Sequence, residues 1–112
     1  MSGSHRFSLF FIIYSFIFFA EGNLNAADGK MVYSKNCVSC HATEGEGNDK
    51  IAALFKIDQA KLSLVGNEAK SKSDADLVKI VLDGNGKMKG LKDKLSQEEA
   101  AAVVKYVRSL QK

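Results

Sequence analysis

Proline and tryptophan are absent from this 112-residue sequence, and cysteine and histidine are scarce, with two residues of each. Without proline, the turns must be formed by glycine, asparagine and aspartate. A structural zinc site needs four Cys or His ligands, and beyond the N-terminal segment the chain offers only Cys37, Cys40 and His41. The formal net charge of +3 is too small for a nucleic-acid binder. The length allows one domain at most, and the sequence contains no internal repeats.

The scarce residues are concentrated in one motif, Cys37-Val38-Ser39-Cys40-His41. Two thiols about one helical turn apart can each add to one vinyl group of a single porphyrin. The histidine that follows then lies under the ring, where its imidazole can bind iron. A thioredoxin-like redox pair is expected near a βαβ pattern, which is missing here. A disulfide within the motif would close a very small ring and leave His41 unexplained. The motif therefore predicts one covalently bound haem c, held by Cys37, Cys40 and His41.

The N-terminal residues have the three-part layout of a secretory signal peptide. A weakly positive start is followed by an almost unbroken apolar run over residues 7–20, and then by small and polar residues. The apolar run is short for a membrane span, which needs about 20 residues. We therefore expect residues 1–27 to be a cleaved leader and residues 28–112 to form the mature domain, in the periplasm. An uncleaved leader that anchors the protein in a membrane is the alternative.

Helical patterns dominate the predicted mature domain. The first helix is expected from about Asp28, its N-cap, to Cys37. Residues 42–49 form a polar, glycine-containing segment that predicts a loop. The apolar stretch 51–57 either packs over one haem edge or simply belongs to the core. No strand pattern competes, so we predict an all-α fold with about four short helices packed around one haem.

Two later helices have clear start signals. Ser73 is a predicted N-cap, followed by two aspartates in the first turn, and Gly84 and Gly86 end this helix. Ser96 and Glu99 form a predicted capping box at the start of the last helix. The last helix carries an apolar face on one side, as expected of a helix that packs on a core.

His41 can fill one axial position of the iron, and Met88 is the candidate for the other. Removal of the leader also removes His5, so a bis-histidine haem cannot form within the mature chain. The other donors are Met31, a lysine, or no protein group. Met31 lies on the predicted helix that leads into the motif and is not expected to fold back over the other face of the ring. Met88 follows a glycine-rich turn in a polar loop, where a core role is not expected.

The order of these elements resembles a small monohaem class I cytochrome c of bacteria, and the resemblance covers essentially the whole predicted mature chain. It rests on Gly29-Lys30-Met31-Val32-Tyr33, the 37–41 motif, Gly84-Asn85-Gly86-Lys87-Met88, and the segment from Leu95 to Val107. In that family a glycine and an aromatic residue on the first helix pack against an aromatic residue on the last. Gly29, Tyr33 and Tyr106 match those positions.

The resemblance implies the cytochrome c fold, a covalent haem c with His41 and Met88 as axial iron ligands, and single-electron transfer. The expected function is therefore that of an exported, monomeric electron carrier, not an enzyme, that serves redox partner proteins. Two alternatives remain open. One is a haem enzyme or gas sensor with a detachable Met88, and the other is a haem subunit of a larger membrane oxidoreductase. A membrane would be involved only through an uncleaved leader or a membrane-bound partner.

The sequence departs from the family pattern in two places. Lys89 stands where members often have proline after the ligand methionine, and no proline is present to offer the carbonyl that orients the ligand histidine in many members. Both departures concern contacts that tune a metal site. The loop around Met88 is also strongly basic. Its lysines predict a rim that steers an acidic redox partner, or simply a solvated face: Lys87, Lys89, Lys92 and Lys94.

Overall fold

The computed structural model describes residues 24–112, with side chains described from Gly29 onward. The predicted leader lies almost wholly outside the described residues and stays a prediction. Helix α1 spans Leu24–Asn36, so it begins before Asp28, where we predicted its start. Across the described part of the chain, no helix is long and apolar enough to cross a membrane.

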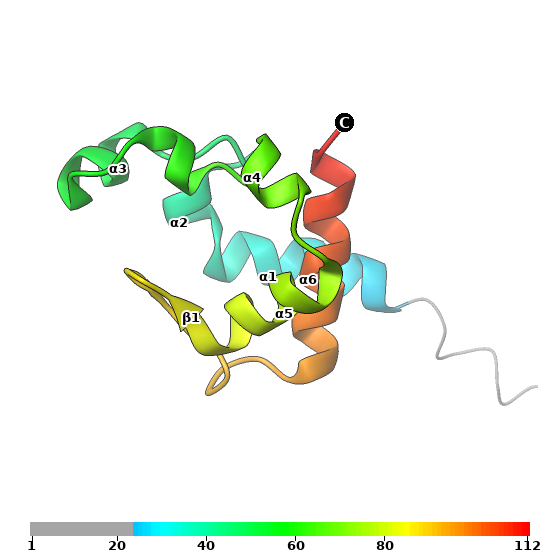
Figure 1. Ribbon diagram of the computed structural model, residues 1–112. Helices are drawn as coiled ribbons and strands as arrows, with labels where there is room; N and C mark the ends of the chain where they lie inside the picture. Colours follow the sequence, from blue (N-terminus) through cyan, green and yellow to red (C-terminus); the bar gives the residue numbers. More distant parts are fainter. Residues whose placement is uncertain (1–23) are drawn as a thin grey trace, which may run out of the picture.

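Helices make up nearly all the regular structure of residues 24–112, as predicted (Figure 1). After α1 they are α2 Val38–His41, α3 Asp49–Phe55, the 3-10 turn η2 Gln59–Leu62, α4 Asn67–Lys70, α5 Asp74–Asp83 and α6 Gln97–Leu110. One antiparallel pair of two-residue strands, β1 Gly84–Asn85 and β2 Met88–Lys89, interrupts them. The sequence did not predict α3, η2 and α4 as helices, because elements this short show no clear periodicity.

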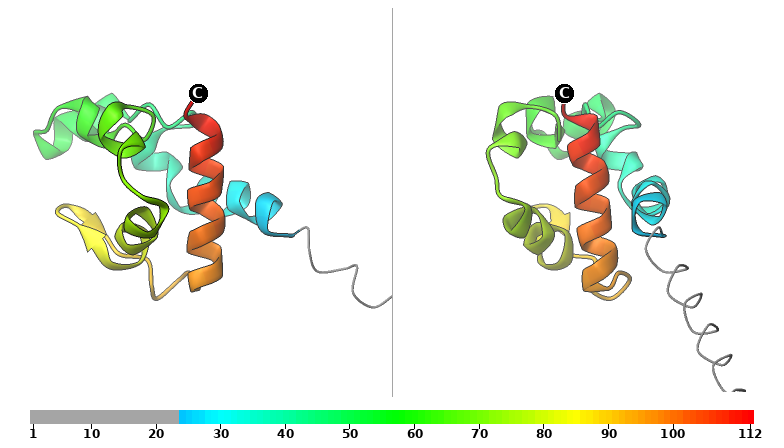
Figure 2. Two further views of the ribbon diagram at one scale, coloured as in Figure 1. Left: turned by 45° about the vertical axis from the view of Figure 1, so that its right-hand side comes forward. Right: turned by 90° about the vertical axis from the view of Figure 1, so that its right-hand side faces the viewer.

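Helix α6 lies at the centre of the described fold, with α1 crossing it and α5 packed on another side (Figure 2). The chain from α2 to α4 passes around the C-terminal end of α6. Helix α3 and the β1–β2 hairpin both project to the same side, away from α6 (Figure 1). This arrangement leaves the residues of the 37–41 motif between α1 and the projecting elements.

The crossing of α1 and α6 requires a glycine. A Cβ atom at Gly29 would lie 2.3 Å from the Ala102 carbonyl oxygen and 3.3 Å from Tyr106 Cβ. One turn later, the rings of Tyr33 and Tyr106 pack with their centroids 5.4 Å apart. The pairing expected for Gly29, Tyr33 and Tyr106 is therefore confirmed, and it anchors a core to which Val103 and other residues of both helices contribute.

The predicted helix starts are present. The Ser73 hydroxyl accepts a hydrogen bond from the backbone N–H of Asp76 at 3.1 Å and caps α5. Ser96 and Glu99 form the reciprocal capping box of α6, with both hydrogen bonds made. These caps satisfy N–H groups that have no partner within their own helix.

Gly84 turns the chain from α5 into the hairpin. Its φ of 88° lies in the left-handed region that favours glycine. A Cβ at this position would lie 2.6 Å from the Met88 carbonyl oxygen, so a side chain would also push the two strands apart. Beyond the hairpin, the N–H of Leu91 donates to the Val81 carbonyl at 2.8 Å, which returns the chain along α5. The predicted loop that carries Met88 is thus a short hairpin fixed against α5.

Candidate haem-binding site

The two cysteines lie at the junction of α1 and α2. Cys37 follows the last residue of α1, is buried, and belongs to the core with Val32 and Tyr33. Cys40 lies in α2 and is half-buried, and neither thiol forms a disulfide. Burial raises the pKa of the Cys37 thiol to about 11, with a further contribution from Cys40. Two free thiols about one turn apart have the spacing that double thioether attachment needs.

His41 is the last residue of α2 and is held from outside the motif. Its Nδ1 lies 2.7 Å from the Leu62 carbonyl oxygen, at the end of η2. Because a carbonyl can only accept, Nδ1 carries the proton and Nε2 is left with its lone pair. Burial lowers the pKa of His41, and the bond to Leu62 opposes that shift. The ring is therefore a neutral, oriented imidazole, which is the state that binds a metal.

The Leu62 carbonyl takes the place of the proline carbonyl that many family members use to orient the ligand histidine. The chain has no proline, and His41 Nδ1 bonds to Leu62 instead. No sequence signal marks Leu62 for this contact, because every residue has a backbone carbonyl and this one lies 21 positions away.

The backbone around His41 is fixed by several further hydrogen bonds. The His41 carbonyl accepts from the N–H of Gly47 at 2.8 Å. Ala42 has φ 70° and ψ 170°, a conformation that residues other than glycine rarely adopt. The hydroxyl of Tyr33, whose residue is 1% exposed, donates to the Ala42 carbonyl at 2.6 Å. The first helix thus holds the strained peptide unit that follows His41.

Met88 is half-buried in β2, on the hairpin that projects beside α3 (Figure 1). The hairpin tip reaches α3, since Lys87 Nζ lies 5.7 Å from the centroid of the Phe55 ring, within cation–π range. Phe55 belongs to the apolar stretch that we expected either over a haem edge or in the core. The contact places this stretch next to the hairpin that carries Met88.

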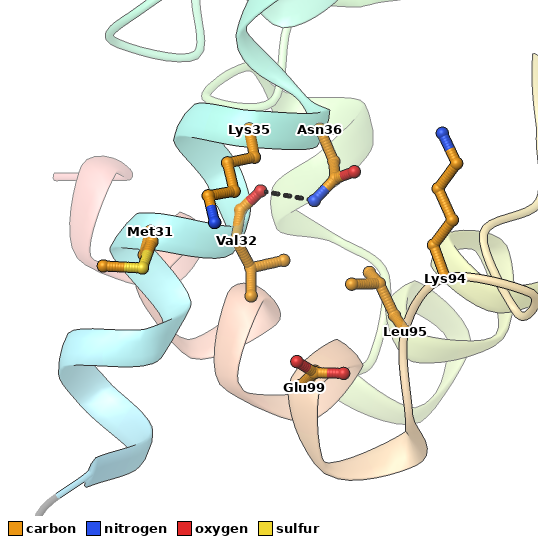
Figure 3. Close-up of a pocket in the computed structure, with 7 residues that line it drawn as sticks. All are labelled: Met31, Val32, Lys35, Asn36, Lys94, Leu95 and Glu99. Atoms are coloured by element: carbon orange, nitrogen blue, oxygen red, sulfur yellow. Dashed lines mark hydrogen bonds between the residues drawn. The ribbon is translucent and has the colours of Figure 1, made fainter.

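Met31, the other methionine weighed as a ligand, is 56% exposed on α1. It lines a hollow of about 300 Å³ between α1 and the start of α6, together with Val32, Leu95 and Glu99 (Figure 3). None of Cys37, Cys40, His41 and Met88 lines this hollow. The hollow is therefore separate from the candidate site, and Met31 belongs to it.

The donor set in the described residues fits a c-type haem better than a bare metal ion. Among the side chains of residues 29–112, no group of three or more His, Cys, Asp or Glu lies together as metal ligands. What the chain brings together is a pair of free thiols and a neutral imidazole with Nε2 unprotonated. The thioether of Met88 comes from a separate element. Fold and donor set together define a haem protein of the c-type cytochrome class.

The chain belongs to the cytochrome c family, in the group described as cytochrome c oxidase, cbb3-type, subunit III, which it matches over residues 24–107. The all-α cytochrome c fold and the covalently bound haem c predicted from the sequence are thereby confirmed. The chain is also similar to a solved structure, the KustC0563 c-type cytochrome, with 26% identity and a TM-score of 0.62. That similarity covers 76% of this chain and 99% of the other.

Two kinds of curated relatives are similar in sequence. Cytochrome c6 of Picosynechococcus sp. is 34% identical over 74% of this chain and 71% of its own length. The cbb3-type cytochrome c oxidase subunit FixP of Bradyrhizobium diazoefficiens is 31% identical over 77% of this chain. The match spans 28% of the length of FixP. The chain is thus similar both to a small cytochrome and to one part of a longer oxidase subunit.

Proposed function

We propose that the protein is a one-electron carrier in which Cys37 and Cys40 hold haem c by thioether bonds and His41 and Met88 bind the iron. The observation that carries this proposal is the 2.7 Å hydrogen bond between His41 Nδ1 and the Leu62 carbonyl. It orients a neutral imidazole directly beside the two free thiols, with Nε2 available to iron. Attachment of the haem would use both thiols, and binding of the iron would use the imidazole ring of His41.

The residues proposed to bind the haem and its iron are suited to electron transfer. The bound haem would supply an iron that cycles between the ferric and ferrous states. Ligands from two separate elements would keep this iron six-coordinate in both states, so little would rearrange when an electron moves. The Met88 thioether and the buried surroundings of Cys37 both favour the ferrous state, and a relatively high potential is expected.

Replacement of Met88 by alanine tests the assignment of the second ligand. The wild-type holoprotein should give a low-spin c-type spectrum with the weak far-red sulfur-to-iron band, unchanged by carbon monoxide. Met88→Ala should lose that band, lower the midpoint potential and allow carbon monoxide to bind the ferrous haem. The matched control is Met31→Ala, which removes an exposed methionine from the separate hollow and should behave as wild type. A Met88→Ala protein with the wild-type spectrum and potential would show that another group binds the iron.

We also propose that the lysines around Met88 steer an acidic redox partner. All four are exposed, and none forms an ion pair with the side chains described from Gly29 onward: Lys87, Lys89, Lys92 and Lys94. Unpaired charges on one rim attract a partner of opposite sign and raise the association rate, and salt screens this effect.

The steering test avoids Lys87, because its charge also contacts the Phe55 ring. Lys89→Glu combined with Lys92→Glu should slow reduction by an acidic partner severalfold at low ionic strength and have little effect at high salt. Lys105→Glu, a reversal at an exposed position of α6, is the control. Equal rates for the double variant and the control at low salt would refute steering by this rim.

The proposed boundaries are a signal peptide over residues 1–27 and a mature, monomeric domain over residues 28–112, exported to the periplasm. Mass spectrometry of the holoprotein purified from the periplasmic fraction tests the cleavage. A measured mass equal to that of residues 28–112 with one haem attached supports the proposal. A full-length protein recovered from the membrane fraction would instead support a retained anchor.

A second candidate function is that of a haem subunit or module in a larger oxidoreductase. The match to the cbb3-type subunit III family and the similarity to FixP favour it. Size-exclusion chromatography of the native protein from its source membranes and periplasm separates the two possibilities. Recovery as a free monomer supports the carrier, and co-elution with oxidase subunits supports the module.

A further inference from the structure

We infer that Gln111, oriented by Arg108, is a positioning residue for His41. The side-chain amide of Gln111 fixes the segment whose Leu62 carbonyl receives the hydrogen bond from His41 Nδ1. This inference rests on the proposed role of His41 as an axial iron ligand. It adds a residue at the far end of the chain that sets how strongly the ligand donates electrons.

Gln111 follows the last residue of α6 and bridges this helix to the segment after η2. Its Nε2 donates to the Leu64 carbonyl at 2.7 Å, and its Oε1 accepts from Arg108 Nη1 at 3.0 Å. A guanidinium can only donate and a carbonyl can only accept. The amide can therefore satisfy both neighbours in one orientation alone, with its NH₂ group toward Leu64.

Arg108 is itself held by the first residue of α5 and by the connection that precedes this helix. Its Nε donates to Asp74 Oδ1 at 2.8 Å, and its Nη2 donates to the Lys72 carbonyl at 2.5 Å. The side chain of Arg108 is 27% exposed, while that of Asp74 is 74% exposed. The backbone carbonyl of Lys72 is thus a partner that does not depend on an exposed carboxylate. Arg108 gives Gln111 a fixed anchor, not a mobile surface contact.

Leu64 is held on both of its backbone groups. Its carbonyl accepts from Gln111, and its N–H donates to the Gly45 carbonyl at 2.7 Å. Gly45 lies in the loop that follows His41, and Leu62 lies two residues before Leu64. The segment 62–64 is therefore pinned between the end of α6 and the His41 loop. Removal of the Gln111 amide would release one of these two holds and let the Leu62 carbonyl move relative to His41.

The consequence concerns the strength of the bond at Nδ1. A strong acceptor at Nδ1 makes the imidazole more basic and a better donor to the metal, which stabilises the ferric state. A looser Leu62 carbonyl would weaken this effect. Loss of the Gln111 amide should therefore raise the midpoint potential and speed the exchange of the Nδ1 proton with solvent.

The test uses two variants of the full-length holoprotein. Gln111→Met is neutral and similar in size but has no N–H donor. Gln111→Glu keeps an acceptor for Arg108 and also lacks the donor, but its added negative charge alone would lower the potential. We expect a potential above wild type in Gln111→Met, where a tenfold change in the relative stability of the two oxidation states is 59 mV. In both variants, Nδ1 proton exchange measured by NMR should be several times faster.

Ser109→Ala is the matched control, since it removes an exposed hydroxyl from the same turn. Among the described residues, this hydroxyl bonds only the Tyr106 carbonyl. Gln111→Met could show the same potential and the same proton exchange as Ser109→Ala, with the His/Met spectrum intact. That result would overturn the positioning role and leave the proposed ligands standing. A His41→Ala protein that retains the wild-type low-spin spectrum would overturn the proposed ligand, and the positioning role with it.

Discussion

Replacement of Gly29 by alanine should destabilise the protein through the crossing of its first and last helices. The new Cβ would lie 2.3 Å from the Ala102 carbonyl oxygen and 2.9 Å from its carbonyl carbon. Both are backbone atoms of α6, so they cannot turn aside as a side chain can. The two helices would have to move apart, which would also loosen the packing of Tyr33 on Tyr106.

Two opposing effects set the size of this change. Overpacking of a close contact costs about 1–3 kcal/mol, while alanine is favoured over glycine in a helix interior by about 1 kcal/mol. The net expectation is a loss of up to about 2 kcal/mol in the free energy of unfolding. Each kcal/mol lowers Tm by roughly 4–8 °C in a domain of this size.

Urea denaturation of the holoprotein, followed by circular dichroism, measures the change. The control is Ser34→Ala, an exposed position on the same helix that adds helix propensity without a clash. Ser34→Ala should be as stable as wild type or slightly more stable. If Gly29→Ala proved as stable as Ser34→Ala, the inference that α1 and α6 approach too closely at Gly29 to admit a side chain would be wrong.

Two further predictions concern single hydrogen bonds. Tyr33→Phe keeps the ring but removes the bond to the Ala42 carbonyl, and should lower the free energy of unfolding by about 1 kcal/mol. Tyr106→Phe is its control, because the Tyr106 hydroxyl has no hydrogen-bond partner among the side chains and backbone described from Gly29 onward. Equal losses in the two variants would contradict the role of the Tyr33 hydroxyl. Ser96→Ala should cost about 0.5–2 kcal/mol by loss of the α6 cap. Chemical denaturation measures this loss, and a cost no greater than that of Gln97→Ala, at the next exposed position, would argue against the cap.

Several local features could be predicted because short-range chemistry decides them. A cap such as Ser73 or Ser96 acts on N–H groups three residues away, and its pattern can be read in the sequence. The helix start at Leu24 was missed, because the predicted signal at Asp28 lies inside the helix. The one-turn elements α3, η2 and α4 were also missed, because so few residues show no period.

The sequence by itself determined the cofactor class, the all-α fold and the residues that meet where α1 crosses α6. The cofactor class depends on residue types at fixed spacings in the 37–41 motif, and the contact of Gly29, Tyr33 and Tyr106 follows from the resemblance to class I cytochromes c. The surroundings of His41 were decided by the tertiary structure alone. The Leu62 carbonyl and the Gln111 amide come from distant parts of the chain, and no side-chain pattern marks a backbone carbonyl as a partner. Folding brings such groups together, and so it is the fold that orients the ring the sequence had already singled out.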